Sequence, residues 1–178
     1  MRDSTRIPPD TKDWTWTLEH RCPDCGLAAG EVPATDVVDG LERALARWPE
    51  VLQRADVHIR RDPARWSDLE YACHVRDVCG VFTRRLQQLR QEDDPIFVDW
   101  DQDETAREGE YSRQTPSAVA TELTQAAALL IGEWGKVGGE EWSRAGRRSD
   151  GSEFTVLTLG QYCLHDLTHH GVDVGLNT

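Results

Sequence analysis

The sequence predicts an all-α protein, a four-helix bundle with one long crossover connection. Four segments carry apolar residues at spacings of three and four, and runs typical of strands are scarce. A long acidic segment separates the second and third of these helices, and it is longer than an ordinary helix–helix turn. The 178 residues are enough for one domain with a sizeable core.

The first predicted helix runs from Thr35 to Gln53, with Thr35 or Asp36 as its N-cap. Pro49 lies inside this pattern, so we expect a kink or a local distortion there. The apolar stripe consists of Val38, Leu41, Leu45, Trp48 and Leu52.

The second predicted helix runs from Ser67 to Gln91 and begins with a capping box, in which Ser67 and Glu70 satisfy each other's backbone amides. His74 lies at the edge of its buried face. The apolar stripe consists of Val75, Val78, Phe82, Leu86 and Leu89.

The third predicted helix starts with Thr115 as N-cap and Pro116 at the first helical position. The last helix is expected to begin near Thr155, and the preceding run EFTVLTL is interpreted as a loop that leads into it. One face of this helix carries Thr158, Tyr162, His165 and His169, and a second face carries Val156, Leu159, Cys163, Leu167 and Val174. Two such faces suit a helix buried between neighbours.

The bundle is expected to span residues 35–178, and residues 1–34 form an N-terminal extension that packs on it. This extension contains a CxxC pair, Cys22 and Cys25. Together with His20 the pair can supply half of a zinc site, although the sequence holds no second CxxC. A thiol-redox pair and a structural turn set by Pro23 and Gly26 are the alternatives.

The composition limits the classes of partner. The formal net charge of −12 disfavours binding to nucleic acid and to anionic membranes. The N-terminal residues lack the apolar stretch of a signal peptide, and no apolar run is long enough to span a bilayer. We therefore expect a cytoplasmic protein with a small-molecule substrate, and one exposed side of the bundle can support a homodimer.

Three of the six histidines are candidate metal ligands. His165 and His169 are four residues apart and share one helix face, and His74 lies on a helix expected to be adjacent. A three-histidine site with open positions can bind a divalent metal ion and activate a small ligand. The alternative is that these histidines are ordinary surface or core residues.

Three stretches, LEYACHVRDV, YSRQTPSAVATEL and HDLTHHGVDV, together resemble the DinB-like superfamily. This superfamily includes the YfiT-like metal-dependent hydrolases and the mycothiol-dependent maleylpyruvate isomerases. The resemblance implies an up-down-down-up bundle and a divalent metal ion, with His74, His165 and His169 in the ligand positions. Because His170 lies about 140° from His165 around the helix, we expect it outside the ligand set.

The resemblance implies a metal-dependent enzyme, either a mycothiol-type thiol S-transferase or a hydrolase. A divalent ion, with zinc or nickel favoured, would activate a low-molecular-weight thiol or a water molecule. Asp77, three residues after His74, is a candidate to orient the His74 imidazole. The alternative function is a non-catalytic metal- or ligand-binding protein of the stress response.

Overall fold

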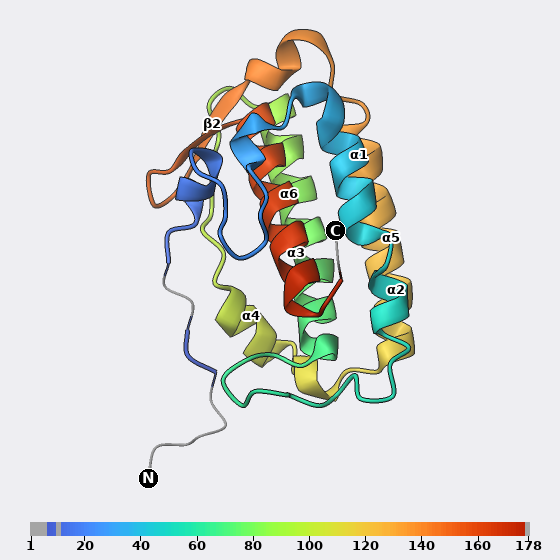
Figure 1. Ribbon diagram of the computed structural model, residues 1–178. Helices are drawn as coiled ribbons and strands as arrows, with labels where there is room; N and C mark the ends of the chain where they lie inside the picture. Colours follow the sequence, from blue (N-terminus) through green and yellow to red (C-terminus); the bar gives the residue numbers. More distant parts are fainter. Residues whose placement is uncertain (1–6, 10–11, 177–178) are drawn as a thin grey trace.

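The computed structural model describes residues 7–9 and 12–176, so residues 1–6 and 10–11 of the predicted extension lie outside the described residues, as do 177–178. Four long helices form the bundle: α1 (Ala34–Leu45), α3 (Asp68–Gln91), α5 (Pro116–Trp134) and α6 (Val156–Asp173). Helix α3 packs against α5 and α6, and α1 packs against the same two helices. Helices α3 and α5 run in one direction and α1 and α6 in the other, which confirms the predicted up-down-down-up topology (Figure 1).

The first predicted helix is divided into two. Helix α1 ends at Leu45, and the short helix α2 (Trp48–Val51) follows with Pro49 in its first turn. Proline is tolerated in the first turn of a helix but not in the interior, so the chain restarts the helix instead of continuing it. The expected distortion at Pro49 is therefore a complete break.

Local capping fixes where α3 and α6 begin. Ser67 accepts a hydrogen bond from the amide of Glu70 (3.3 Å), and its own amide donates to Glu70 Oε2 (2.8 Å), which completes the predicted capping box. Helix α6 begins after Thr155, whose hydroxyl oxygen accepts a bond from the Thr158 amide (3.1 Å). Helix α5 begins at Pro116, as the sequence predicts.

The long crossover between α3 and α5 contains structure of its own. It holds β1 (Ile96–Phe97), helix α4 (Gln102–Glu108) and the 3₁₀ turn η3 (Tyr111–Arg113). Strand β1 pairs in parallel with β2 (Ala145–Arg148), and β2 pairs antiparallel with β3 (Glu153–Thr155). The interpretation of EFTVLTL as a loop was therefore wrong at Glu153–Thr155, because this short segment pairs antiparallel with the preceding strand β2.

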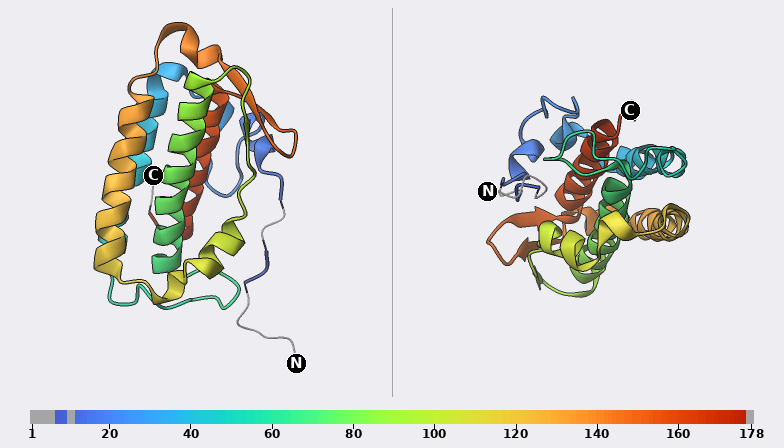
Figure 2. Two further views of the ribbon diagram at one scale, coloured as in Figure 1. Left: turned by 180° about the vertical axis from the view of Figure 1, so that it is seen from behind. Right: turned by 90° about the horizontal axis from the view of Figure 1, so that it is seen from below.

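The N-terminal segment lies along α6. It contains the 3₁₀ turns η1 (Thr15–Leu18) and η2 (Ala29–Glu31), and both contact α6 (Figure 2). A further 3₁₀ turn, η4 (Gly139–Ser143), precedes β2 and also contacts α6. Helix α6 is thus enclosed by α1, α3 and the N-terminal segment.

Within the described residues, no helix has both the length and the apolar character that crossing a membrane requires.

Close packing around Gly160 should make an added methyl group destabilising. A Cβ added at Gly160 would lie 2.7 Å from Trp134 Nε1 and 3.0 Å from Val37 Cγ1, and both neighbours are fully buried. Overpacking typically costs about 1–3 kcal/mol, whereas alanine gains about 1 kcal/mol over glycine in a helix. We expect Gly160→Ala to lower the free energy of unfolding by about 1–2 kcal/mol in urea denaturation.

Gly132 of α5 is the matched control, because a Cβ there meets no atom within 4 Å. Gly132→Ala should raise the free energy of unfolding by up to about 1 kcal/mol. If both variants are stabilised, α6 does not approach Trp134 of α5 as closely at Gly160 as the structure shows.

Candidate metal centres

Helix α6 carries two pairs of possible metal ligands, each with a spacing of four residues: His165 with His169, and Asp166 with His170. Adjacent residues differ by about 100° around a helix, so the two pairs point in different directions. Asp166 and His170 lie with His74 of α3, and we call these three residues the α3–α6 cluster. The second pair joins two cysteines of the N-terminal segment; we call Cys22, Cys25, His165 and His169 the Cys/His cluster.

The three ligands predicted from the sequence do not meet in one place. In each cluster the possible ligand atoms lie within 4.8 Å of one another, and His74 belongs to a different cluster from His165 and His169. The face of α6 that approaches α3 is the one that carries Asp166 and His170. His170, which we expected to lie apart from His74, instead lies in the same cluster as His74. His165, from which its direction was measured, points toward the N-terminal segment.

His74 is fully buried, and neither of its ring nitrogens has a hydrogen-bond partner in the described part of the protein. Its Nε2 atom lies 4.0 Å from Asp166 Oδ1. Two tryptophans cover the imidazole: the ring centroid of Trp66 is 5.0 Å away, and Trp100 stacks on it at 5.4 Å with an angle of 4° between the planes. Aromatic walls thus surround an imidazole whose polar atoms lack partners.

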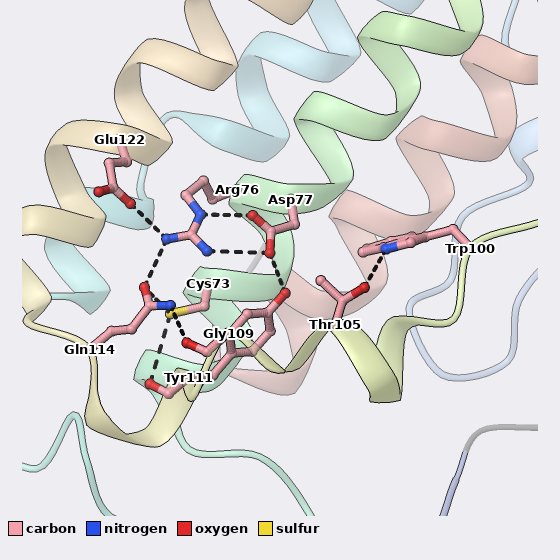
Figure 3. Close-up of polar contacts among 9 residues, drawn as sticks. All are labelled: Cys73, Arg76, Asp77, Trp100, Thr105, Gly109, Tyr111, Gln114 and Glu122. Carbon is pink, nitrogen blue, oxygen red and sulfur yellow. Dashed lines mark hydrogen bonds and ion pairs between the residues drawn. The ribbon is translucent and has the colours of Figure 1, made fainter. Parts of the chain in front are cut away.

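The crossover segment that supplies Trp100 is fastened to α3 and α5 by a polar network (Figure 3). The Trp100 indole donates to Thr105 Oγ1 (2.7 Å), which anchors it to α4. Asp77 accepts hydrogen bonds from Arg76 (2.8 Å) and from the Tyr111 hydroxyl. Asp77 therefore serves to hold η3 on α3, which differs from its predicted role of orienting His74.

His170 lies between two carboxylates. Its Nε2 is 3.0 Å from Asp166 Oδ1, and its Nδ1 is 3.0 Å from Asp173 Oδ2. Asp173 also forms an ion pair with Arg65. An imidazole held at Nδ1 by a carboxylate presents Nε2 in a fixed direction, which is the arrangement that supports metal-ligating histidines in proteins.

The electrostatics of the α3–α6 cluster differ from residue to residue. Burial lowers the pKa of His74, so its imidazole is neutral and able to ligate. Burial acts to lower the pKa of His170 as well, but hydrogen bonds to Asp166 and Asp173 raise it to about 9. Burial acts to raise the pKa of Asp166, yet the contact with His170 and the nearby His74 imidazole hold it below its ordinary value. Asp166 is consequently a carboxylate at neutral pH.

In the Cys/His cluster, Cys22 Sγ lies 3.6 Å from His169 Nδ1. Burial lowers the pKa of His165 to about 4 and raises that of Cys25 to about 11. His20, considered with the CxxC pair in the sequence, is exposed and is not part of the cluster.

A pocket of about 700 Å³ opens beside both clusters. Asp166 and His170 form part of its wall, and the N-terminal segment contributes Lys12, Trp14 and Asp24. A volume of this size is typical of sites for small molecules.

Asp166 and His170 were not selected from the sequence. Their spacing of four residues is the same signal as that of His165 and His169, displaced by one position. A carboxylate paired with a histidine is as suitable a metal-ligand set as two histidines, so the signal was present in the same motif.

The chain is thus a four-helix-bundle protein in which the two clusters are candidate metal centres. The DinB superfamily model matches residues 34–172, and the chain belongs to this superfamily. No curated protein matches the sequence.

Two solved structures share the fold. YfiT from Bacillus subtilis, described as a probable metal-dependent hydrolase with an unusual four-helix bundle topology, superposes with a TM-score of 0.69 at 14% identity. The match covers 79% of this chain and 85% of YfiT. A mycothiol-dependent maleylpyruvate isomerase superposes with a TM-score of 0.64 at 13% identity, over 83% of this chain and 62% of the isomerase.

The polar network around Asp77 should stabilise the fold. Asp77→Asn keeps the side-chain shape but removes the charge that accepts from Arg76 and Tyr111. Hydrogen bonds to charged groups contribute about 1.5–3 kcal/mol, so we expect the free energy of unfolding in urea to fall by about 1–3 kcal/mol.

The control is Glu122→Gln, at the other end of the same network. Glu122 also pairs with Arg76, but its side chain is 54% exposed, so its loss should cost less than about 1 kcal/mol. Equal effects of the two substitutions would contradict the structural role given to Asp77.

Proposed function

We propose that the protein is a metal-dependent enzyme whose ion is held by His74, Asp166 and His170, and that it hydrolyses a small-molecule substrate. The observation that carries this proposal is the buried His74 imidazole, whose two nitrogens lack partners in the described residues. Leaving a buried polar group unsatisfied costs about 1–3 kcal/mol. A divalent ion between His74, Asp166 and His170 would satisfy it.

The surroundings favour a catalytic centre over a structural one. Three protein ligands leave at least one coordination position for water or substrate, whereas structural zinc sites use four. Asp166 and His170 also line the 700 Å³ pocket, so a bound molecule can reach the cluster. These features favour an enzyme over the non-catalytic binding protein that remains the alternative.

The donor set favours hydrolysis. Two imidazoles and one carboxylate are the ligands of hydrolytic zinc centres, and such a site with a divalent ion carries one net positive charge. When bound, the ion would supply Lewis-acid activation of water. Zinc is the metal we propose first; the same donors also suit nickel and iron(II).

The chain's own residues would prepare the site for this chemistry. Asp173 holds the His170 Nδ1 proton, so Nε2 is the nitrogen directed toward Asp166 and His74. Trp66 and Trp100 keep water away from the buried side of His74. Asp166 and His170 face the pocket, so a substrate would approach the ion from that side.

Thiol S-transfer is the second candidate function. Its support is the fold shared with a mycothiol-dependent enzyme, together with two cationic side chains, Lys12 and Arg65, in the pocket wall. These cations would attract an anionic low-molecular-weight thiol, and a divalent ion lowers the pKa of a bound thiol.

Removing His74 tests the proposal. His74→Ala should lose about one ion per chain and lower activity by more than about 100-fold, because the variant lacks a direct ligand; Asp173→Asn should weaken metal affinity by about 10–100-fold. Metal content is measured by elemental analysis of untagged protein. Activity is screened in parallel with ester and amide substrates and with thiols plus electrophiles, which separates the two candidate reactions.

His58→Ala is the control, since His58 is exposed and belongs to neither cluster. It should keep both the metal and the activity of the wild type. A His74→Ala protein that retains its full metal content would overturn the proposed centre.

A further inference from the structure

We propose a second metal site in this protein: a four-ligand zinc centre formed by Cys22, Cys25, His165 and His169. It lies outside the α3–α6 cluster and does not depend on the proposed function. Its two cysteines precede residue 34, where the match to the DinB superfamily begins, so the bundle alone cannot form it.

The ligand types and spacings are those of a structural zinc site. Two thiolates separated by two residues and two imidazoles separated by three form a complete tetrahedral donor set. The two pairs come from segments far apart in the chain, yet their ligand atoms all lie within 4.8 Å of one another. Four protein ligands leave no position for substrate, so this centre is structural.

The distances fit zinc. Bonds of about 2.3 Å to sulfur and about 2.1 Å to nitrogen, at a tetrahedral angle, place the two ligand atoms about 3.6 Å apart. Cys22 Sγ and His169 Nδ1 are separated by 3.6 Å. His165 is only 3% exposed and its Nε2 atom has no hydrogen-bond partner in the described residues, so a nitrogen is available to bind.

The backbone around the two cysteines has a conformation that suits metal binding. The amide of Cys22 donates to Leu27 O and the amide of Gly26 donates to Cys22 O, both at 2.9 Å, which folds the segment into a tight knuckle. Gly26 has a φ of +76°, a conformation that favours glycine. The knuckle turns both cysteines toward α6, and Cys22 is fully buried there.

The site would fasten the N-terminal segment to α6. The ring of Trp14 packs against His169, with centroids 5.1 Å apart, and Lys12, Trp14 and Asp24 form one wall of the pocket. An ion bound by Cys22 and His169 therefore holds this wall beside the α3–α6 cluster. Without it, contacts such as the hydrogen bonds from Gln161 to Gly30 O and Val32 O would remain, and the turn that carries the cysteines would open more easily.

Cobalt substitution of the wild-type protein is the direct test. A centre with two cysteine ligands should give an intense sulfur-to-cobalt charge-transfer band in the near ultraviolet. His74→Ala should keep this band while losing about one ion per chain, and Cys22→Ser/Cys25→Ser should lose the band and the other ion. Cys73→Ala, which removes a buried thiol of α3, is the matched control and should keep the band.

Trypsin digestion of the His74→Ala protein gives a second readout that needs no activity. Cleavage after Arg21 should be slow when zinc is bound and at least about tenfold faster after chelation, because local opening exposes the segment. A wild-type cobalt protein without the sulfur band would overturn the site, leaving the Cys22–His169 contact as a simple hydrogen bond. So would a Cys22→Ser/Cys25→Ser protein with unchanged metal content.

Discussion

The rotation of about 100° between adjacent residues of α6 is the constraint on which the functional architecture depends. It separates two ligand pairs that overlap in sequence and directs one toward α3 and the other toward the N-terminal segment. Helix α6 is enclosed on both of these sides, so neither pair is left on an open surface. In the proposed arrangement, one helix would supply ligands both to a centre with an open position and to a centre closed by four ligands.

The other possible ligands of each α6 pair come from a different part of the chain. His74 reaches Asp166 and His170 through the packing of two bundle helices, which belongs to the family fold. Cys22 and Cys25 reach His165 and His169 through a segment that precedes the family match. The pocket beside the two centres has walls from both parts of the chain. The N-terminal segment therefore forms part of the wall of the pocket.

The long crossover has a comparable role on the opposite side of His74. Asp77 and Tyr111 hold it on α3, and Trp100 donates a hydrogen bond to Thr105 (Figure 3). The Trp100 indole in turn stacks on the His74 imidazole. A connection between two parallel helices has to return along the length of the bundle (Figure 1). Here its helix, its strand and its polar network also complete the covering of the α3–α6 cluster.

Much of the fold follows from local signals. Ser67, Pro116 and Thr155 mark where three bundle helices begin, since capping depends on residues within one turn. The three short strands were missed because they have only 2, 4 and 3 residues, too few for a periodic pattern. In addition, β1 pairs with a strand far along the chain, which periodicity within a window cannot reveal. Helical spacing likewise identified ligand pairs on α6, but which pair faces α3 depends on how the helix is rotated in the bundle. Contacts such as that of Gly160 with Trp134 set this rotation, and they are visible only in three dimensions.

Anomalous diffraction at the zinc edge, from crystals of the untagged protein grown with zinc, would locate the bound ions directly. We expect two separate peaks, one among His74, Asp166 and His170 and the other among Cys22, Cys25, His165 and His169. A single peak coordinated by His74, His165 and His169 would contradict this expectation, and would restore the one-centre site that the histidine spacing alone suggests.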